Sequence, residues 1–191
     1  DEARRGWLYP LDLNPSAKSA FKLGEFNKYR IEVIGDEIKT FLNGQEVAYV
    51  VDDMDSKGFV GLQVHSIRNP EDAGRKTYFR NVRIKTENLD PKPFDSDIFV
   101  VNNRKNELTD YEITQGWRLL FNGHNAEGWV GAYKDSFPDF GWSVSDGVLT
   151  IAASDGGEST NAGDIVTEEK FSAFDLGFEF KLTEGANSGV K

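Results

Sequence analysis

The side chains best suited to proton transfer at neutral pH are two histidines, His65 and His124. His65 ends an alternating run over residues 59–65, on the same side as Gln63 and opposite the apolar set Val60, Leu62 and Val64. An imidazole can accept or deliver a proton, and a carboxamide can bind a polar ligand as both donor and acceptor. The alternative interpretation is a pair of polar strand residues that face water. His124 lies in a turn and is interpreted as a turn residue.

A second group combines basic and aromatic side chains near the start of the chain, namely Arg4, Arg5, Trp7 and Tyr9. Aromatic faces stack on apolar surfaces of a ligand, and a guanidinium binds hydroxyls, carbonyls or carboxylates. Arg5 and Trp7 are therefore candidates for a substrate groove. A loop that packs its rings on the edge of the fold is the alternative.

Metal and cofactor chemistry finds little support in the sequence. The acidic run Asp52, Asp53 and Asp55 lacks the bidentate glutamate of an EF-hand, and we interpret it as a solvated turn rather than a calcium site. Two histidines cannot form an imidazole metal cage, and the sequence has no Gly-rich phosphate loop and no Ser-His-Asp signature. We predict no metal site and no cofactor.

Composition narrows the class of protein. The chain has 191 residues and a formal net charge of −10, which argues against a nucleic-acid groove because phosphates need clustered basic side chains. No run approaches the ~18 to 20 apolar residues of a membrane helix. The absence of cysteine excludes disulfides, thiolate zinc sites and cysteine nucleophiles.

Short alternating runs separated by Gly, Asn and Asp predict β-strands and hairpins along the whole chain. The Asn43-Gly44 pair predicts a type I′ turn, because both residues of that turn need a positive φ. No helical stripe is longer than two turns, so we predict an all-β protein, an antiparallel β-sandwich. The strands are expected at residues 29–34, 38–42, 47–51, 59–65, 78–85, 116–123 (a short strand into a turn), 142–144, 148–151 and 174–182.

The alternation also predicts which side chains form the core. Val60, Leu62 and Val64 should be buried between sheets, with Gln63 and His65 pointing away from that core. The inward set of the last strand should be Phe174, Leu176, Phe178, Phe180 and Leu182.

The organisation of the chain is predicted from a stretch without periodicity, which begins at residue 90. We place a linker at residues 90–110, between a first part, 1–89, and a second part, 111–191. The chain opens without Met or a targeting signal and stops just after a turn that begins another strand. We interpret it as an internal piece of a longer protein.

Several segments resemble, in order and spacing, the 3-keto-disaccharide hydrolase domain family, which has a concanavalin-like lectin/glucanase fold. The C-terminal half of that domain is resembled by residues 24–35, 41–44, 61–65 and 79–85. Its N-terminal half is resembled by residues 116–123, 128–129, 142–147, 174–176 and 187–190. Because the halves are reversed, the chain resembles the junction of two tandem copies, each truncated. The implied fold is a concanavalin-like jelly roll that is incomplete or permuted.

The resemblance implies a carbohydrate-active hydrolase or lyase-like protein that cleaves glycosidic bonds of 3-keto-disaccharides or related glycosides. A ketone at C3 acidifies the C2 proton, so one general base can eliminate the C1 leaving group before water adds back. His65 is then the expected proton-transfer residue, with Gln63 and Arg5 as positioning groups. The other substrate-binding candidates are Trp7 and the turn residues Asn187 and Ser188, which in the family lead into groove-facing strands.

The implied partner is a carbohydrate ligand, and the implied location is extracytoplasmic, either periplasmic or secreted. The alternative function is a non-catalytic carbohydrate-binding module of a larger extracytoplasmic protein, because a fold does not fix a function. A structural or interaction domain is a third hypothesis. The reversed halves also predict that residues 29–85 pair with or contact residues 117–182, or pair with the missing halves of the tandem domains.

Overall fold

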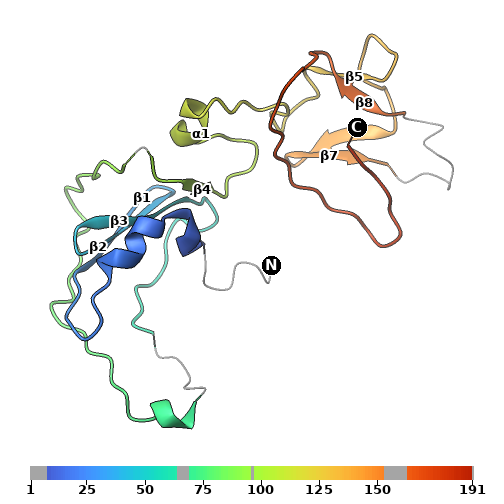
Figure 1. Cartoon of the computed structure of the whole chain (residues 1–191). Coiled ribbons are helices and arrows are strands. Elements are labelled where there is room, and N and C mark those ends of the chain that lie inside the picture. The colour runs from blue at the N-terminus through green and yellow to red at the C-terminus, as the bar shows by residue number, and fades with distance from the viewer. Residues whose placement is uncertain (1–7, 64–68, 96, 153–162, 191) are drawn as a thin grey trace. The chain divides into compact units, whose positions relative to one another are not determined.

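The computed structural model of the chain describes residues 8–63, 69–95, 97–152 and 163–190. Its backbone divides into two compact units, residues 1–119 and residues 120–191. The described residues form short strands with a few short helices, which confirms the predicted all-β class (Figure 1).

The first unit is organised around one four-stranded sheet in the order β1-β2-β3-β4. Strands β1 (Tyr29–Ile34), β2 (Glu37–Leu42) and β3 (Gln45–Val51) form an antiparallel meander, as predicted. The turn between β2 and β3 has φ values of 53° at Asn43 and 90° at Gly44, which confirms the expected positive φ at both residues. Strand β4 (Val100–Asn102) pairs in parallel with β3.

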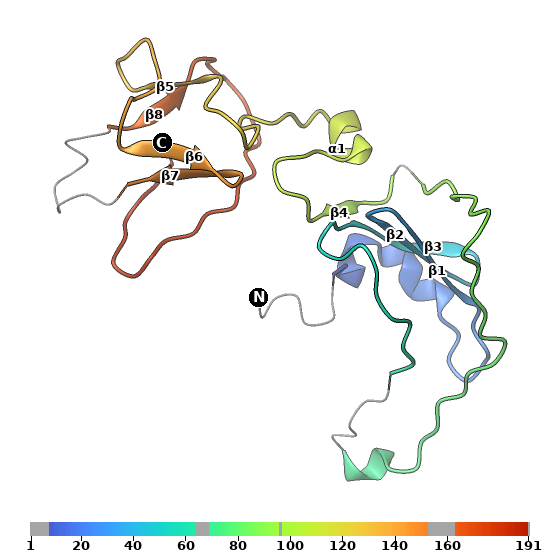
Figure 2. The same ribbon diagram turned by 180° about the vertical axis from the view of Figure 1, so that it is seen from behind.

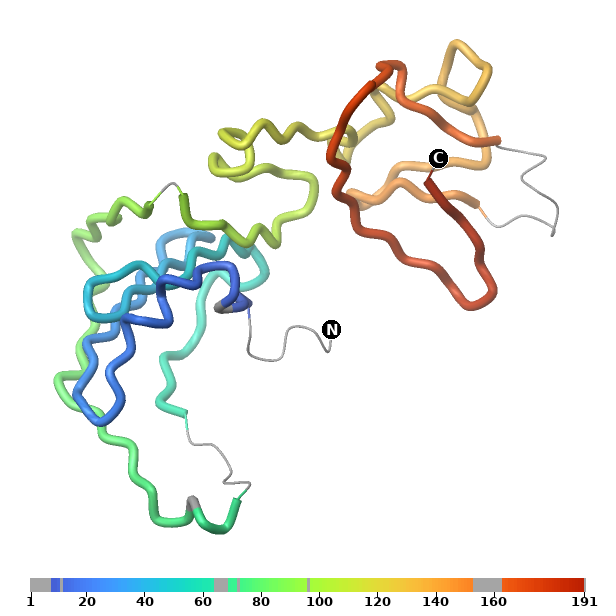
Figure 3. Tube along the Cα trace, in the orientation of Figure 1, coloured from blue at the N-terminus to red at the C-terminus, as the bar shows by residue number. Residues whose placement is uncertain are grey.

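One face of this sheet is covered by two short helices, η2 (Leu11–Leu13) and η3 (Pro15–Ala20), which lie against it in Figures 1 and 3. The Asn14 side-chain amide donates to the carbonyl oxygens of Glu46 at 3.1 Å and Val47 at 3.0 Å. These bonds attach the start of η3 to β3. The small apolar core under the helices contains Ala17, Ala20 and Val50, all buried.

The opposite face of the sheet is covered in part by residues that the sequence placed in a linker. The Phe94 ring packs edge-on against Phe41, with 5.8 Å between centroids, and against Tyr49, with 5.3 Å. The backbone N–H of Lys92 donates to Glu32 Oε1 at 3.0 Å. Strand β4 also comes from this stretch, so part of residues 90–110 is folded onto the first unit.

A short helix follows β4 in the same unit. Helix α1 (Asp110–Thr114) begins with a capping box, in which Thr109 Oγ1 accepts from the Glu112 backbone N–H at 3.2 Å. The Glu112 carboxylate in turn accepts from the Thr109 backbone N–H at 2.8 Å. This reciprocal pair satisfies N–H groups that a helix start otherwise leaves unpaired.

The second unit contains two antiparallel strand pairs, which Figure 2 shows one above the other. Strand β5 (Trp129–Gly131) pairs with β8 (Ile165–Thr167), and β6 (Trp142–Ser145) pairs with β7 (Val148–Ile151). The β6–β7 hairpin was predicted, and its turn has the expected positive φ at Asp146, 52°, and Gly147, 75°.

The predicted burial of residues 59–65 is wrong for its described part. Val60 is 81% exposed and Leu62 is 56% exposed, and residues 59–63 form no strand, while Val64 lies outside the described residues. Residues 78–85 are likewise not a strand, and between these segments the chain passes through η4 (Pro70–Asp72). Alternation gives a strand two distinct sides, but a side is buried only when another element covers it.

The predicted inward set of residues 174–182 is wrong for the same reason. Phe174, Leu176, Phe178, Phe180 and Leu182 are between 39% and 75% exposed, and the segment is not a strand. Residues 116–123 form no strand either. Every strand pair described in the structure joins strands of the same unit. The expected pairing of residues 29–85 with residues 117–182 therefore stays a prediction.

Candidate functional site

Three of the six site residues predicted from the sequence, His65, Arg5 and Trp7, lie outside the described residues. Gln63 is exposed in the first unit, in a stretch that is neither helix nor strand. Asn187 and Ser188 are exposed in the second unit. The functional roles of all six residues stay predictions.

The two interpretations of other polar residues as turn residues can be compared with the structure. His124 is exposed, and its backbone N–H donates to Asn122 Oδ1 at 2.8 Å, as expected for a turn. Asp53 and Asp55 are exposed, whereas Asp52 Oδ2 accepts from the side-chain amide of Asn103 at 2.8 Å. Asp52 therefore helps to hold the chain after β3 beside the chain after β4.

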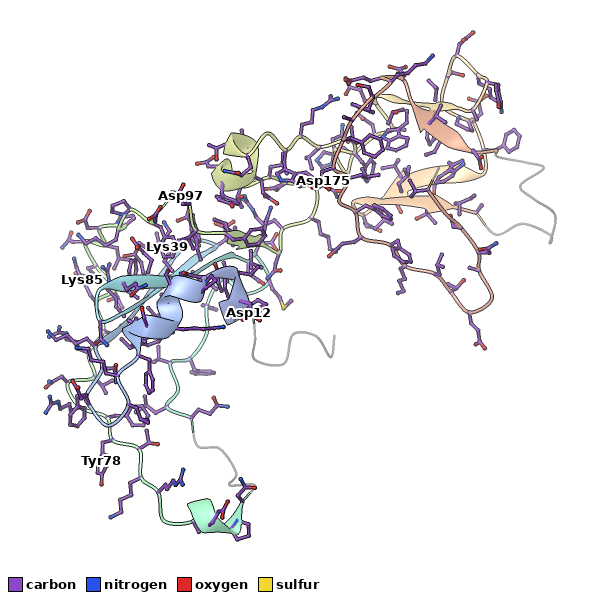
Figure 4. All side chains as sticks on the ribbon, in the orientation of Figure 1. Asp12, Lys39, Tyr78, Lys85, Asp97 and Asp175 are labelled. Atoms are coloured by element: carbon purple, nitrogen blue, oxygen red, sulfur yellow. The ribbon has the colours of Figure 1, made fainter. Side chains whose placement is uncertain are left out.

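The best-defined charged cluster of the first unit lies on the sheet face opposite η3, where Figure 4 labels Lys39. Glu32 and Lys39 are each only 8% exposed. Glu32 forms an ion pair with Arg30, and Lys39 Nζ lies 2.7 Å from Glu37 Oε2. The paired partners explain how these charges can be buried, because an unpaired charge in such a position is costly.

Aromatic rings are interleaved with these charges. The Arg30 guanidinium lies 5.2 Å from the centroid of Phe41, and Lys39 Nζ lies 4.6 Å from the centroid of Tyr49. Burial, followed by the nearby carboxylate of Glu37, raises the pKa of the Tyr49 hydroxyl. Tyr49 is therefore a neutral hydroxyl at physiological pH. Together these groups form a packed face of the sheet in which each charge has a partner and the rings shield the buried charges from water.

The sequence contained part of the signal for this face. Arg30 and Glu32 alternate with the apolar residues of β1, so a charged side of that strand was visible. The cover over it was not, because Phe94 belongs to a stretch without periodicity. The apolar side of β1 turned out to be the more exposed one, with Tyr29, Ile31 and Val33 between 57% and 59% exposed.

Neither a metal centre nor a membrane helix is found in the part of the chain that the structure describes. Within those residues, no three His, Cys, Asp or Glu side chains are grouped so that they could hold a metal ion. Among the same residues, no helix has the length and apolar character needed to cross a bilayer.

Comparison with known proteins identifies the relationship of the chain. Residues 1–85 and 116–191 match the family described as the 3-keto-alpha-glucoside-1,2-lyase-like domain. A protein of Bacteroides thetaiotaomicron named 3-keto-disaccharide hydrolase is 36% identical over 77 residues. That alignment covers 39% of this chain and 26% of the relative, so the chain spans about a quarter of the relative it matches. Because the family match extends over most of both units, the chain belongs to the family of 3-keto-alpha-glucoside-1,2-lyase-like domains.

Proposed function

We propose that this chain is part of a carbohydrate-active enzyme that cleaves glycosidic bonds of 3-keto-disaccharides or related glycosides. The family match over residues 1–85 and 116–191 is the observation that carries this proposal. The similar protein of Bacteroides thetaiotaomicron, named 3-keto-disaccharide hydrolase, supports the same substrate class.

The reaction requires one proton-transfer group rather than the two carboxylates of ordinary glycosidases. A base removes the proton from C2, because the adjacent C3 ketone stabilises the resulting enolate. The enolate then expels the alkoxide at C1 and leaves a C1–C2 double bond conjugated to the ketone. Addition of water returns a hydroxyl to C1 and a proton to C2, which completes hydrolysis.

In this proposal His65 transfers the proton, and Gln63 and Arg5 position the substrate. Gln63 is exposed, so its carboxamide is accessible to a sugar hydroxyl. Trp7, Asn187 and Ser188 complete the proposed substrate-binding set. The proposed location of the protein is extracytoplasmic, and the proposed origin of the two matched segments is the junction of two tandem copies.

The test is an assay of the intact chain, and of the longer protein that contains it, on a 3-keto-disaccharide. His65→Ala should lower turnover by roughly 10²- to 10⁴-fold, the usual contribution of a general base. His124→Ala is the matched control, because His124 is the other histidine and lies exposed in a turn. Equal activity of the two variants would remove His65 from the mechanism. No turnover by either wild-type protein would refute the proposed activity.

A non-catalytic carbohydrate-binding module is the second candidate function. The family match fixes a domain family, and the same fold can carry a binding surface without a catalytic set. Saturable binding of the 3-keto-disaccharide by the longer protein, with no product formed, would support the module over the enzyme.

A further inference from the structure

A hollow of about 380 Å³ lies in the first unit, between the β2–β3–β4 part of the sheet and helix α1. This volume falls within the range of small-molecule sites. Three aromatic side chains contribute to its wall, from β3, from the stretch before β4 and from α1. They are Tyr49, Phe94 and Tyr111.

The hollow is built mainly by a stretch that the family match leaves out. Four of its thirteen lining residues, including Tyr49, come from the matched residues 1–85. The other nine, including Arg104 and Tyr111, come from residues 94–114, which lie between the two matched segments. Most of the residues that line the hollow therefore lie outside the segments that match the family.

The hollow is lined by four carboxylates, of Asp36, Glu37, Asp95 and Asp110, and by one guanidinium, of Arg104. Arg104 Nη1 lies 3.3 Å from Asp36 Oδ2 and 3.2 Å from Glu107 Oε2. Glu37, on the other wall, is paired with Lys39 at 2.7 Å. The lining is therefore net acidic, which disfavours an anion, and its carboxylate oxygens can accept hydrogen bonds from hydroxyl groups of a ligand. This combination favours a neutral ligand with several hydroxyl groups.

Arg104 also has a hydrogen-bond donor that none of the described residues accepts. Its Nε is buried and has no hydrogen-bond partner among the described residues, although its Nη2 donates to the Leu108 carbonyl at 3.4 Å. A buried N–H without an acceptor costs free energy, so this Nε gains a partner only if the Arg104 side chain moves. Sugar hydroxyls can donate to the carboxylates of the hollow, and sugar C–H groups suit aromatic walls such as Phe94 and Tyr111.

We propose that the hollow between the sheet and α1 binds one neutral sugar residue and is a carbohydrate subsite separate from the reacting centre. The choice of a sugar among neutral polyols rests on the proposed function. Such a subsite would hold a carbohydrate on the protein through the stretch that joins the two family segments.

Titration of the intact chain with methyl α-glucoside, followed by calorimetry and by amide chemical shifts, tests this proposal. The probe has no ketone, so it is bound without being turned over. Tyr49→Phe should weaken binding roughly fivefold, the value of one hydrogen bond, and leave the fold intact. Tyr111→Ala should weaken it roughly tenfold or more because an aromatic wall is lost. Tyr78→Phe is the control, because Tyr78 is exposed and does not line the hollow.

The outcomes separate this inference from the proposed activity. His65→Ala should lower turnover of a 3-keto-disaccharide by roughly 10²- to 10⁴-fold and leave methyl α-glucoside binding unchanged, which would support two separate sites. Absence of saturable binding by the wild-type chain would overturn the subsite. Equal affinities of Tyr49→Phe and Tyr111→Ala with the wild type, in variants that keep their circular dichroism, would also overturn it. Tighter binding of glucosamine than of methyl α-glucoside, by tenfold or more, would replace it with a cation site.

Discussion

Phe94 offers the sharpest test of how the first unit is held together. It comes from the stretch between the two family segments, and its ring contacts Phe41 and Tyr49 on the sheet. Replacing a fully buried phenylalanine by alanine costs about 3–5 kcal/mol. Phe94 keeps part of its surface exposed, so we expect Phe94→Ala to cost about 2–3 kcal/mol, including the loss of two edge-on ring pairs. This corresponds to a roughly 30- to 150-fold shift in the unfolding equilibrium of the unit.

The assay is urea unfolding followed by far-UV circular dichroism, together with hydrogen exchange of peptides from β2 and β3. Exchange should become faster in those strands, because Phe94 covers Phe41 and Tyr49. Phe79→Ala is the matched control, because Phe79 is 55% exposed in the same unit, and it should change stability by less than about 0.5 kcal/mol. If both variants unfold at the same urea concentration and exchange in β2 and β3 is unchanged, the packing of residues 92–94 on the sheet is not a source of stability.

Three further predictions concern the hairpin, the buried tyrosine and the two units. Asn43→Ala should destabilise the first unit by about 2 kcal/mol, because it strains a positive φ and removes side-chain bonds to Lys28 and Ala20. Asn81→Ala is the control for backbone strain alone, because Asn81 is exposed and has a φ of 55°. If Asn43→Ala and Asn81→Ala lower the free energy of unfolding in urea equally, the side-chain bonds of Asn43 do not stabilise the unit. The raised pKa of Tyr49 means that the folded state binds the hydroxyl proton more tightly than the unfolded state does, so stability should be constant below about pH 10 and fall above it. In Tyr49→Phe the melting temperature should fall less above about pH 10. An unchanged fall would show that Tyr49 does not cause it. Because the chain has no cysteine, engineered cysteine pairs, one in residues 29–85 and one in residues 117–182, can test the expected contact between these ranges. We expect at least one pair to form a disulfide within one chain or between chains. If no pair forms a disulfide, the expected contact is refuted.

The sequence predicted those strands whose pairing is decided locally. The Asn43-Gly44 and Asp146-Gly147 turns each join two adjacent strands, so a short window contains both the strands and the turn that sets their register. Residues 59–63 and 174–182 have equally clear alternation, but burial depends on partners far away in the chain, and a short window contains no information about them. The cover over the sheet was missed for a related reason, because Phe94 acts through a single ring and not through a periodic pattern.

The candidate site shows the same division between local and distant information. The alternation of β1 predicted that Arg30 and Glu32 lie on its charged side. No pattern near Glu32 in the sequence indicated that the backbone N–H of Lys92 would donate to its carboxylate. Arg104 and Tyr111 gave no motif at all, because the hollow exists only where β3, β4 and α1 meet. Ion pairs between residues far apart in the chain form only in the folded state, so no regular spacing in the sequence indicates them.

The parallel pairing of β4 with β3 has a consequence for the order of folding. The three strands of the meander are joined by short turns, whereas β3 and β4 meet only after residues 52–99 have closed into a loop. Closing that loop costs roughly 3 kcal/mol more chain entropy than closing a two-residue turn. The meander is therefore expected to form early, and β4, with Arg104 and α1 behind it, is expected to dock late and to open first. A ligand bound between β3 and α1 would slow the opening of β4. Hydrogen exchange of β4 would therefore show whether the hollow is occupied, and it would do so separately from the slower exchange of the meander strands.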